Sequence, residues 1–586
     1  MLSTLTYYIR WGASWLVLFA FGKLYFLWVN GGSGAESLSP FFSVWRAGLG
    51  LDLAMIGYYS ILPLVLLIIR TFTKLPIRRI GVIYGWLIWI FSVLILAVDP
   101  YFFYYWGQKT NLDFTQFLGE DSAGIFSIEP VTFVSSILFF GVCIIGYTKV
   151  FRRVFTFPAK GNSLVILFLL VLSFILLRGG LGEVPINLSS AYFSQNNTHN
   201  NAAVNPVWQF MATEFEKDKH AALQFFETDA QAQEILNTSF KPSTKNLTHL
   251  LKPYNEQTNI ILVVLESFSA KVVGHVSNSP FASTPRLDSV AQTGIAFSQA
   301  YASSFRSDKG LLAITTGIPS GARQTLTNFP SQLAPKPSVF KLFKDDYLTS
   351  FYYGGSIEFA NIKMLFTEAD QVKAIDDFKS SRASTWGIHD EDVFDEFAHD
   401  FTKRTKPQFS MLFSLSSHEP FDVPNFQVNA DPYLNSISYT DSCLGVMLNQ
   451  IKQSDKWQNS LIIITADHGV IRPDNAPIYH ESNFRIPLVF TGGMVKKDTL
   501  ISDIVSQADI PATLADYMNQ SDFFNQSSVF HSNQRAFYAY HNGVVSITPS
   551  CTQYYDINQQ KYLFDTCNKP IEKAYYQVAN KEFFGR

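Results

Sequence analysis

The sequence predicts a membrane-anchored α/β protein, in which five apolar helices precede a domain built on a mostly parallel sheet. Residues 1–180 of the 586-residue chain are strongly apolar, whereas the remainder has the composition of an ordinary globular domain. From residue 258 onward, apolar strand-like runs alternate with helical segments, which is typical of an α/β fold with a buried sheet. The net charge of −3 gives no indication of a nucleic-acid partner.

The N-terminal region contains five apolar runs that are long enough, or nearly so, to cross a hydrocarbon core of ~30 Å as helices. They cover residues 11–29, 48–69, 80–98, 131–149 and 163–177. The loops after the second and fourth runs are rich in lysine and arginine, whereas the other two loops carry only Arg46 and Lys109. Because basic loops stay in the cytoplasm, we expect a cytoplasmic N-terminus and an exported chain after about residue 178. No small-residue cleavage site follows the first run, which favours an anchor over a removed signal peptide.

Charged residues interrupt the apolar region at Lys23, inside the first run, and at Asp52, near the outer start of the second. Such residues either serve a function at membrane depth or pair structurally. Residues 179–256 begin with two glycines and an asparagine-rich stretch that cannot form a core alone. The expected organisation is a transmembrane domain at 1–178, a linker with connecting helices at 179–256, and a catalytic domain at 257–586.

Reactive side chains follow three of the expected strands. Glu266 ends the run IILVVLE, His418 follows FSLSS, and Asp467 and His468 follow LIIIT. Reactive groups collect at the carboxyl ends of strands in such sheets. Carboxylate and imidazole groups together are suitable ligands for a divalent metal ion.

A small polar loop runs into an apolar helical segment within residues 303–320, and Ser307 lies at or next to the start of that helix. Free backbone N–H groups and the helix dipole favour phosphate or sulfate at such a position. From the residues alone, a simple helix cap is an alternative reading of Ser307, and Ser303 and Ser304 are neighbouring candidates for a nucleophile.

Taken in order, these pieces resemble the sulfatase-like branch of the alkaline phosphatase superfamily. More closely, they resemble the lipoteichoic acid synthase group of membrane-anchored phosphoglycerol transferases. The motifs that carry the resemblance are the strand ending in Glu266, FRSDKGLLAITTG, SLSSHEPF, TADHG and YHESNFRIPLVF. The resemblance implies an extracytoplasmic sulfatase-like domain on five transmembrane helices of a bacterial inner membrane.

The resemblance also assigns the metal site. Glu266, Ser307, Asp467 and His468 match the family's ligands for one divalent ion, with Mn²⁺ favoured and Mg²⁺ or Zn²⁺ as alternatives. Ser307 matches the nucleophile because sulfatases place a Thr-Gly pair nine and ten positions later, where this chain has Thr316 and Gly317. That spacing selects Ser307 over Ser303 and Ser304.

A substrate pocket is implied as well, with His418 as a second catalytic residue beside the transferred phosphate. The residues expected to contact substrate are Arg306, Trp386, His418, His480 and Arg485. Sulfatases carry Pro or Ala two positions after the nucleophile and Arg four positions after it. Here those positions are Lys309 and Leu311, so sulfate-ester hydrolysis is not expected.

The resulting prediction is a phosphoglycerol-type headgroup transferase with a covalent phospho-serine intermediate. The expected donor is phosphatidylglycerol, and the acceptor is a glycan or glycolipid of the cell envelope. A phosphoethanolamine transferase, or a phosphodiesterase or sulfatase-like hydrolase, is the alternative on the same scaffold. A non-catalytic binding module is the alternative from another class, and the presence of all the expected ligands argues against it.

Two of the four cysteines, Cys551 and Cys567, flank a short polar loop near the C-terminus. If this region lies outside the cytoplasm, they can form a disulfide.

Overall fold

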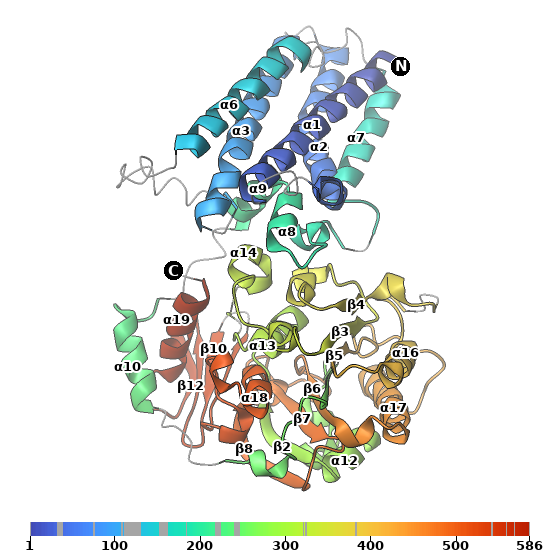
Figure 1. Cartoon of the computed structure of the whole chain (residues 1–586), viewed down its shortest axis with the longest axis vertical. Coiled ribbons are helices and arrows are strands. Elements are labelled where there is room, and N and C mark those ends of the chain that lie inside the picture. Colours follow the sequence, from blue (N-terminus) through green and yellow to red (C-terminus); the bar gives the residue numbers. More distant parts are fainter. Residues whose placement is uncertain are drawn as a thin grey trace. The chain divides into compact units, whose positions relative to one another are not determined.

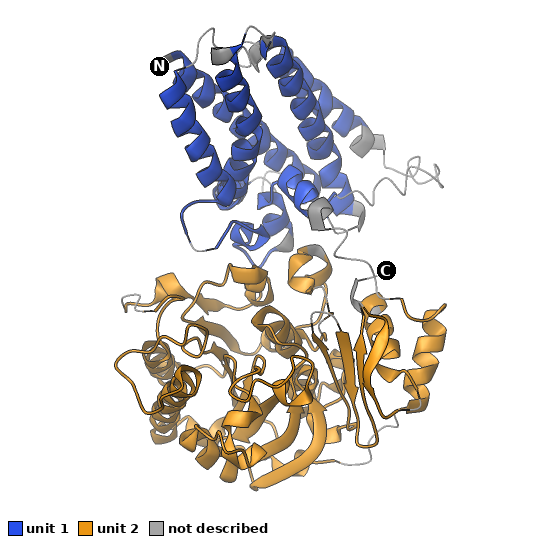
Figure 2. Ribbon diagram, turned by 180° about the vertical axis from the view of Figure 1, so that it is seen from behind, with its two compact units in different colours: residues 1–219 blue, residues 220–586 orange. Residues whose placement is uncertain are grey.

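The computed structural model describes most of residues 2–584. The stretches outside the described residues are 32–38, 74–76, 107–108, 111–129, 152–161, 183, 217–223, 240–245, 320, 323–324, 381–383, 541–542, 558 and 568. The chain divides into two compact units, Met1–Lys219 and His220–Arg586 (Figure 2). Several basic residues used to predict the membrane orientation, among them Lys74, Arg152 and Lys160, lie outside the described residues.

The first unit is helical. Its long elements are α1 (Leu2–Asn30), α2 (Phe41–Phe72), α3 (Ile77–Trp106), α6 (Pro130–Gly146) and α7 (Ser163–Arg178) (Figure 1). By length and composition, three helices can cross a membrane, within α1, α2 and α3. The described helices α6 and α7 are apolar but have only 17 and 16 residues. Three of the five predicted spans are thus helices long and apolar enough to cross a membrane, and the count of five stays a prediction.

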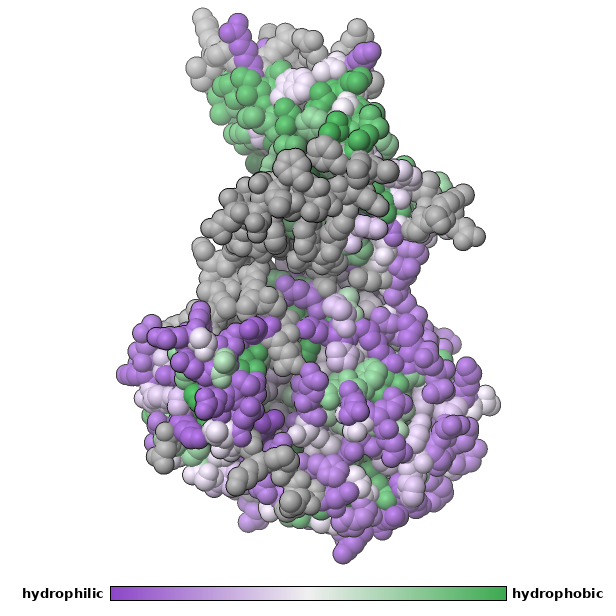
Figure 3. All heavy atoms as spheres, turned by 60° about the vertical axis from the view of Figure 1, so that its left-hand side comes forward, coloured by the Kyte–Doolittle hydropathy of each residue, from purple (hydrophilic) through white to green (hydrophobic). Residues whose placement is uncertain are grey.

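Aromatic side chains fill the interior of the helical unit. Trp11, Trp15 and Trp89 are buried, and the rings of Trp15 and Trp89 lie 5.1 Å apart. Large apolar side chains such as Leu138 and Leu164 point outward instead. On the face seen in Figure 3, this unit exposes a band of hydrophobic side chains, whereas the second unit is mainly hydrophilic. An apolar exterior is suited to a lipid environment.

A buried ion pair between α1 and α2 is hydrogen-bonded to the residue that connects the short helices α8 (Asn197–Ala203) and α9 (Pro206–Glu216). Lys23 Nζ lies 2.7 Å from Asp52 Oδ1, and the Asn205 side-chain amide donates to the same oxygen at 2.8 Å. The carbonyl oxygen of the Asn205 side chain accepts from the backbone N–H groups of Val207 and Trp208 at the start of α9. A Cβ on Gly48 would come within 2.0 Å of the Ala203 carbonyl oxygen, so only glycine permits this approach.

The second unit contains an eight-stranded sheet. Its strands are β1 (Asn259–Leu265), β2 (Ile295–Tyr301), β3 (Leu348–Tyr353), β4 (Gln371–Lys373), β5 (Gln408–Phe413), β6 (Ser460–Ala466), β7 (Arg485–Thr491) and β8 (Thr499–Ser506), in the order β4-β3-β5-β1-β6-β7-β2-β8. Only β7 is reversed, and it pairs antiparallel with both β6 and β2. The α/β prediction is confirmed, but the sheet is mixed.

Apolar strands and flanking helices build the core of this unit. Strands β1 and β6 are buried along their whole length, as expected for central strands covered on both faces. The principal helices are α12 (Pro285–Gln292), α13 (Ser307–Thr316), α16 (Asp390–Lys403), α17 (Pro432–Gln453) and α18 (Ile510–Tyr517).

A four-stranded antiparallel sheet follows near the C-terminus, which the sequence analysis did not foresee. Its strands are β9 (Ala536–Tyr540), β10 (Gly543–Ile547), β11 (Thr552–Asp556) and β12 (Lys561–Asp565). Helices α10 (Asp229–Ser239) and α19 (Ile571–Phe584) belong to the same region (Figure 1). The Cys551–Cys567 disulfide, with a Cα–Cα distance of 5.0 Å, links the start of β11 to the segment after β12 and confirms that prediction.

Candidate active site

The candidate site begins where two adjacent parallel strands end. Leu265 of β1 is in register with Ala466 of β6, so the next residues, Glu266 and Asp467, emerge side by side. The ligand atoms of Glu266, Asp467 and His468 lie within 4.8 Å of one another, and all three residues are buried. The structure thus brings together the three residues that were expected to bind a metal.

The environment of these side chains fits a divalent cation. His468 Nδ1 lies 3.0 Å from the Gly469 carbonyl oxygen, which can only accept, so the lone pair of a neutral ring is on Nε2. Nε2 lies 3.6 Å from Glu266 Oε1 and 3.3 Å from Asp467 Oδ2. Asp467 Oδ2 is buried and accepts no hydrogen bond from the described residues.

The electrostatics of the two carboxylates also favour a bound cation. Burial, followed by repulsion from Glu266, raises the pKa of the Asp467 carboxyl well above its usual range. Two buried carboxylates that face one imidazole lone pair are poorly stabilised without a cation. Oxygen and nitrogen donors in this arrangement are suitable for Mn²⁺, Mg²⁺ or Zn²⁺.

Serines that the sequence analysis missed hold the two carboxylates. The Ser267 N–H donates to Asp467 Oδ1 at 2.9 Å, and its hydroxyl donates to Glu266 Oε1 at 2.7 Å. Ser267 adopts a positive φ of 59°, which turns the chain just after the strand. Ser414 and Ser417, which follow β5, fix the Glu266 backbone through its N–H and carbonyl groups. Ser414 and Ser417 belong to the motif SLSSHEPF, whereas the only sequence signal of Ser267 is its position after a strand.

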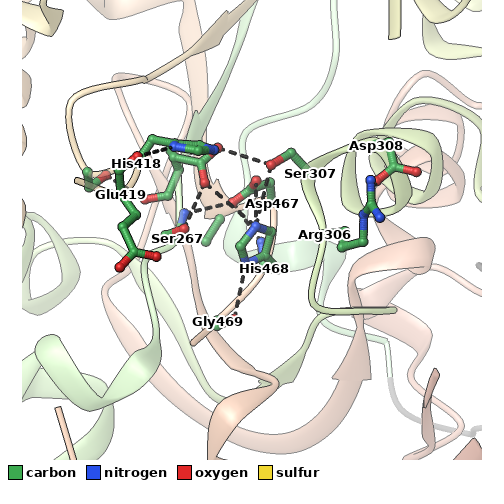
Figure 4. A network of polar contacts seen from close by, with 12 residues as sticks. Ser267, Arg306, Ser307, Asp308, His418, Glu419, Asp467, His468 and Gly469 are labelled. Atoms are coloured by element: carbon green, nitrogen blue, oxygen red, sulfur yellow. Dashed lines mark hydrogen bonds and ion pairs between the residues drawn. The ribbon is translucent and has the colours of Figure 1, made fainter. Parts of the chain in front are cut away.

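Ser307 lies beside the same cluster. It is the first residue of α13, and its Oγ donates to Glu266 Oε2 at 3.2 Å and lies 3.4 Å from His468 Nε2 (Figure 4). Ser304 instead donates its hydroxyl to the carbonyl oxygen of Ala539 in β9, at 2.9 Å. Of these two serines, only Ser307 therefore has its hydroxyl against the cluster.

The helix start is held close to the strand end. A Cβ added to Gly310 would lie 2.0 Å from the Asp467 carbonyl oxygen, so α13 packs directly on the backbone of that residue. Lys309 Nζ donates to the carbonyl oxygens of Gly321 and Ala322, and burial lowers its pKa to about 8. This lysine therefore holds the segment after α13.

His418 and Trp386 form a second group. Their rings lie 4.4 Å apart, and both side chains donate to the Glu419 carbonyl oxygen, at 2.9 Å from His418 Nδ1 and 2.7 Å from Trp386 Nε1. This shared acceptor fixes the histidine tautomer and leaves Nε2 for another partner.

Three expected substrate contacts are not brought into the cluster. Arg306 pairs with Asp308 at 3.1 Å, on the side away from Asp467 and His468 (Figure 4). The guanidinium of Arg485 donates to the carbonyl oxygens of Ser298 and Val276. His480 is exposed, and its Nδ1 lies 2.9 Å from the Ser482 hydroxyl. The described contacts of Arg485 are thus with backbone carbonyl groups of distant segments, and those of His480 are with a neighbour in sequence.

Comparisons with known proteins agree with this geometry. Residues 258–520 match the Sulfatase family model. The chain is 22% identical over 228 residues to the lipoteichoic acid synthase-like protein YvgJ of Bacillus subtilis. It is 24% identical over 241 residues to the lipoteichoic acid synthase of Staphylococcus saprophyticus. Each match covers 36% of this chain and 36% of the relative, so the chain spans little more than a third of either protein's length.

A solved structure has the same fold. The crystal structure of an alkaline phosphatase superfamily protein from Vibrio parahaemolyticus superposes with a TM-score of 0.53 and 23% identity, covering 61% of this chain and 97% of that one. Residues 258–520 therefore form a domain of the Sulfatase family, and the chain is similar to lipoteichoic acid synthases.

Proposed function

We propose that the protein transfers a phosphoglycerol-type headgroup from a membrane phospholipid to a glycan or glycolipid of the cell envelope. The observation that carries the proposal is the position of Ser307, whose hydroxyl starts a helix and lies 3.2 Å from Glu266 and 3.4 Å from His468. A nucleophile, an anion-binding helix start and a set of metal ligands coincide there. The apolar N-terminal helices and the similarity to lipoteichoic acid synthases support a lipid donor.

The proposed reaction has two displacements at phosphorus. The Ser307 oxygen attacks the donor phosphodiester, forms an O–P bond and gives its proton to water, while the bond to diacylglycerol breaks. His418 Nε2 delivers a proton to the departing oxygen. An acceptor hydroxyl then attacks the phospho-serine and loses its proton to His418, while the bond from phosphorus to Ser307 breaks and the serine oxygen takes a proton back from water.

Glu266, Asp467 and His468 would hold one divalent cation, with Ser307 as a further ligand. Such an ion supplies Lewis-acid chemistry, because it lowers the pKa of a bound hydroxyl and neutralises charge on the phosphate. We favour Mn²⁺ on the resemblance, with Mg²⁺ and Zn²⁺ as alternatives. Ser267 would keep both carboxylates oriented throughout the cycle.

The test uses the full chain in detergent with headgroup-labelled phosphatidylglycerol and phosphatidylethanolamine. We expect phosphatidylglycerol to release diacylglycerol and to leave label on Ser307. Ser307→Ala should lower turnover by at least about three orders of magnitude, as for loss of a nucleophile in other covalent enzymes. Ser307→Thr should keep part of the activity, because the hydroxyl remains.

Ser304→Ala is the matched control, since this serine lies three positions away but bonds to β9. It should stay active. Label on Ser304, or normal turnover by Ser307→Ala, would contradict the assignment. Release from phosphatidylethanolamine alone would support the phosphoethanolamine alternative, and label passing only to water would indicate a phosphodiesterase.

A further inference from the structure

We propose that Gln507 is a positioning residue of this site. Its side-chain amide locks the end of β6, which carries Asp467 and His468, to the loop that leads into Ser307. The inference rests on the proposed function only in taking Ser307, Asp467 and His468 as the reactive group. No motif in the sequence marks Gln507, because it lies 40 positions from Asp467.

The amide makes three hydrogen bonds inside the domain. Gln507 Nε2 donates to the carbonyl oxygens of Ala466 and Asp467, both at 2.7 Å. Its Oε1 accepts from the Ser303 N–H at 3.1 Å. The side chain is buried, with an exposed fraction of 1%. One amide thus joins the strand end of the expected metal ligands to the loop of the expected nucleophile.

Sheet topology explains why this link is needed. Strands β6 and β8 are separated in the sheet by β7 and β2, and Gln507 directly follows β8. The β6–β7 ladder ends with the pair Thr465 and Leu488, so it does not reach Ala466 or Asp467 on that side. Without the Gln507 amide, two buried carbonyl oxygens would lose their donor, which is costly in a protein interior.

Two further observations fix the amide in one orientation. Rotating it by 180° would place its oxygen against two carbonyl oxygens and its NH₂ group against an N–H donor, so only one orientation satisfies all partners. The backbone of Gln507 is itself held, because Ser506 and Asp509 form a reciprocal cap around it. A rigid amide of this kind can set the distance between two loops.

The same carbonyl oxygen of Asp467 also receives α13. Gly310 approaches it so closely that a Cβ would lie 2.0 Å away. A shift of the Asp467 carbonyl oxygen would therefore move two reactive groups. One is the carboxylate of Asp467 itself, and the other is the hydroxyl of Ser307, which lies one turn before Gly310. A shift of about 1 Å in such a constellation can lower turnover by about 100-fold.

The test compares Gln507→Met with Gln577→Met in the full chain, purified in detergent. Methionine has nearly the shape of glutamine but makes none of these hydrogen bonds. Gln577 is a matched control, because it is also buried and its amide joins Phe225, Phe226 and Asp229 in the C-terminal region. Both variants should lower the melting temperature by similar amounts.

Only Gln507→Met should change the site. We expect kcat for a labelled lipid or a chromogenic phosphodiester to fall by about 100-fold, with KM changed less than twofold. Mn²⁺ affinity, measured by calorimetry, should fall by about tenfold, whereas Gln577→Met should leave both quantities within twofold. Gln507→Glu serves as a second variant if the methionine protein does not fold. Its affinity for Mn²⁺ should also be lower than that of the wild type.

The proposal is overturned if Gln507→Met and Gln507→Glu alter Mn²⁺ affinity no more than Gln577→Met does. A wild-type protein that binds Mn²⁺ but turns over no phosphodiester would contradict the proposed function instead. The role of Gln507 would then be judged by metal affinity alone.

Discussion

Among single residues, Asp467 has two carboxylate oxygens in different environments. Its Oδ1 accepts from the backbone N–H groups of Ser267 and His468, at 2.9 and 2.7 Å. Its Oδ2 faces Glu266 and His468 and has no hydrogen-bond donor among the described residues. The first oxygen fixes the side chain, and the second is therefore available to a metal ion.

Glu572 is a buried carboxyl away from the candidate site, and it gives the protein a pH-dependent stability. Burial raises its pKa from 4.5 to about 7. Between these values the native state binds more protons than the unfolded state, so the free energy of unfolding falls as the pH rises. Glu572→Gln should remove this penalty and stabilise the second unit at pH 8, by on the order of 3 kcal/mol.

Thermal unfolding of the full chain at pH 5 and pH 8 measures this effect. The melting temperature of Glu572→Gln should exceed that of wild type at pH 8 and approach it at pH 5. Glu234→Gln, at an exposed position of α10, should change neither value. Equal pH dependence in wild type and Glu572→Gln would contradict the assignment.

Sequence reasoning grouped Glu266, Asp467, His468 and Ser307, which the fold brings close together, because each follows or starts an element within a recognisable motif. It could not find Ser267 or Gln507, since their roles depend on contacts between segments distant in sequence. It also grouped Arg485 with the substrate residues, whereas the folded chain places its guanidinium on backbone carbonyls. A charged side chain next to a motif can form hydrogen bonds to the protein backbone instead of contacting a ligand.

Among the elements, α1 and α2 are tied to each other by the buried Lys23–Asp52 pair, and Asn205, between α8 and α9, bonds to the same aspartate. Asp52→Asn would leave the Lys23 ammonium buried without a charge partner, which costs about 3–5 kcal/mol in other proteins. We expect the detergent-solubilised protein to unfold at a markedly lower temperature. Replacing both residues by apolar side chains of similar size should recover much of the loss.

Lys149→Met is the control for this experiment, because it removes an exposed charge at the end of the α6 segment. It should leave the unfolding temperature unchanged. If Asp52→Asn behaves like Lys149→Met, the pair does not stabilise the helical unit.

The direction of strands was harder to predict than their existence. The run RIPLVF reads as a buried strand in either direction, because an apolar run covered on both faces carries no signal of orientation. The reversal of β7 follows from the chain entering from the loop that contains His480 and Asn483 rather than from a crossover helix. The C-terminal sheet was missed for a related reason, since its short strands are interrupted by polar turns.

For the whole molecule, three spans or five give the same orientation, because both numbers are odd. With either number, we expect the second unit on the opposite side of the membrane from the N-terminus. The Cys551–Cys567 disulfide is consistent with an oxidising compartment. Alkaline phosphatase fused after Arg586 should therefore be active, and the same reporter fused after Thr73 should be inactive. Activity in the reverse pattern would contradict the orientation.

The bond between Ser304 and Ala539 bears on how the catalytic part could be isolated as a soluble fragment. Ser304 and Ser303 bond to both polar groups of the Ala539 backbone in β9, whereas the family match ends at residue 520. A fragment cut at the family boundaries would lack Ala539, and the loop before Ser307 would lose both of these hydrogen bonds. Recombinant work should therefore keep the chain through α19, even though the sulfatase family model does not extend that far.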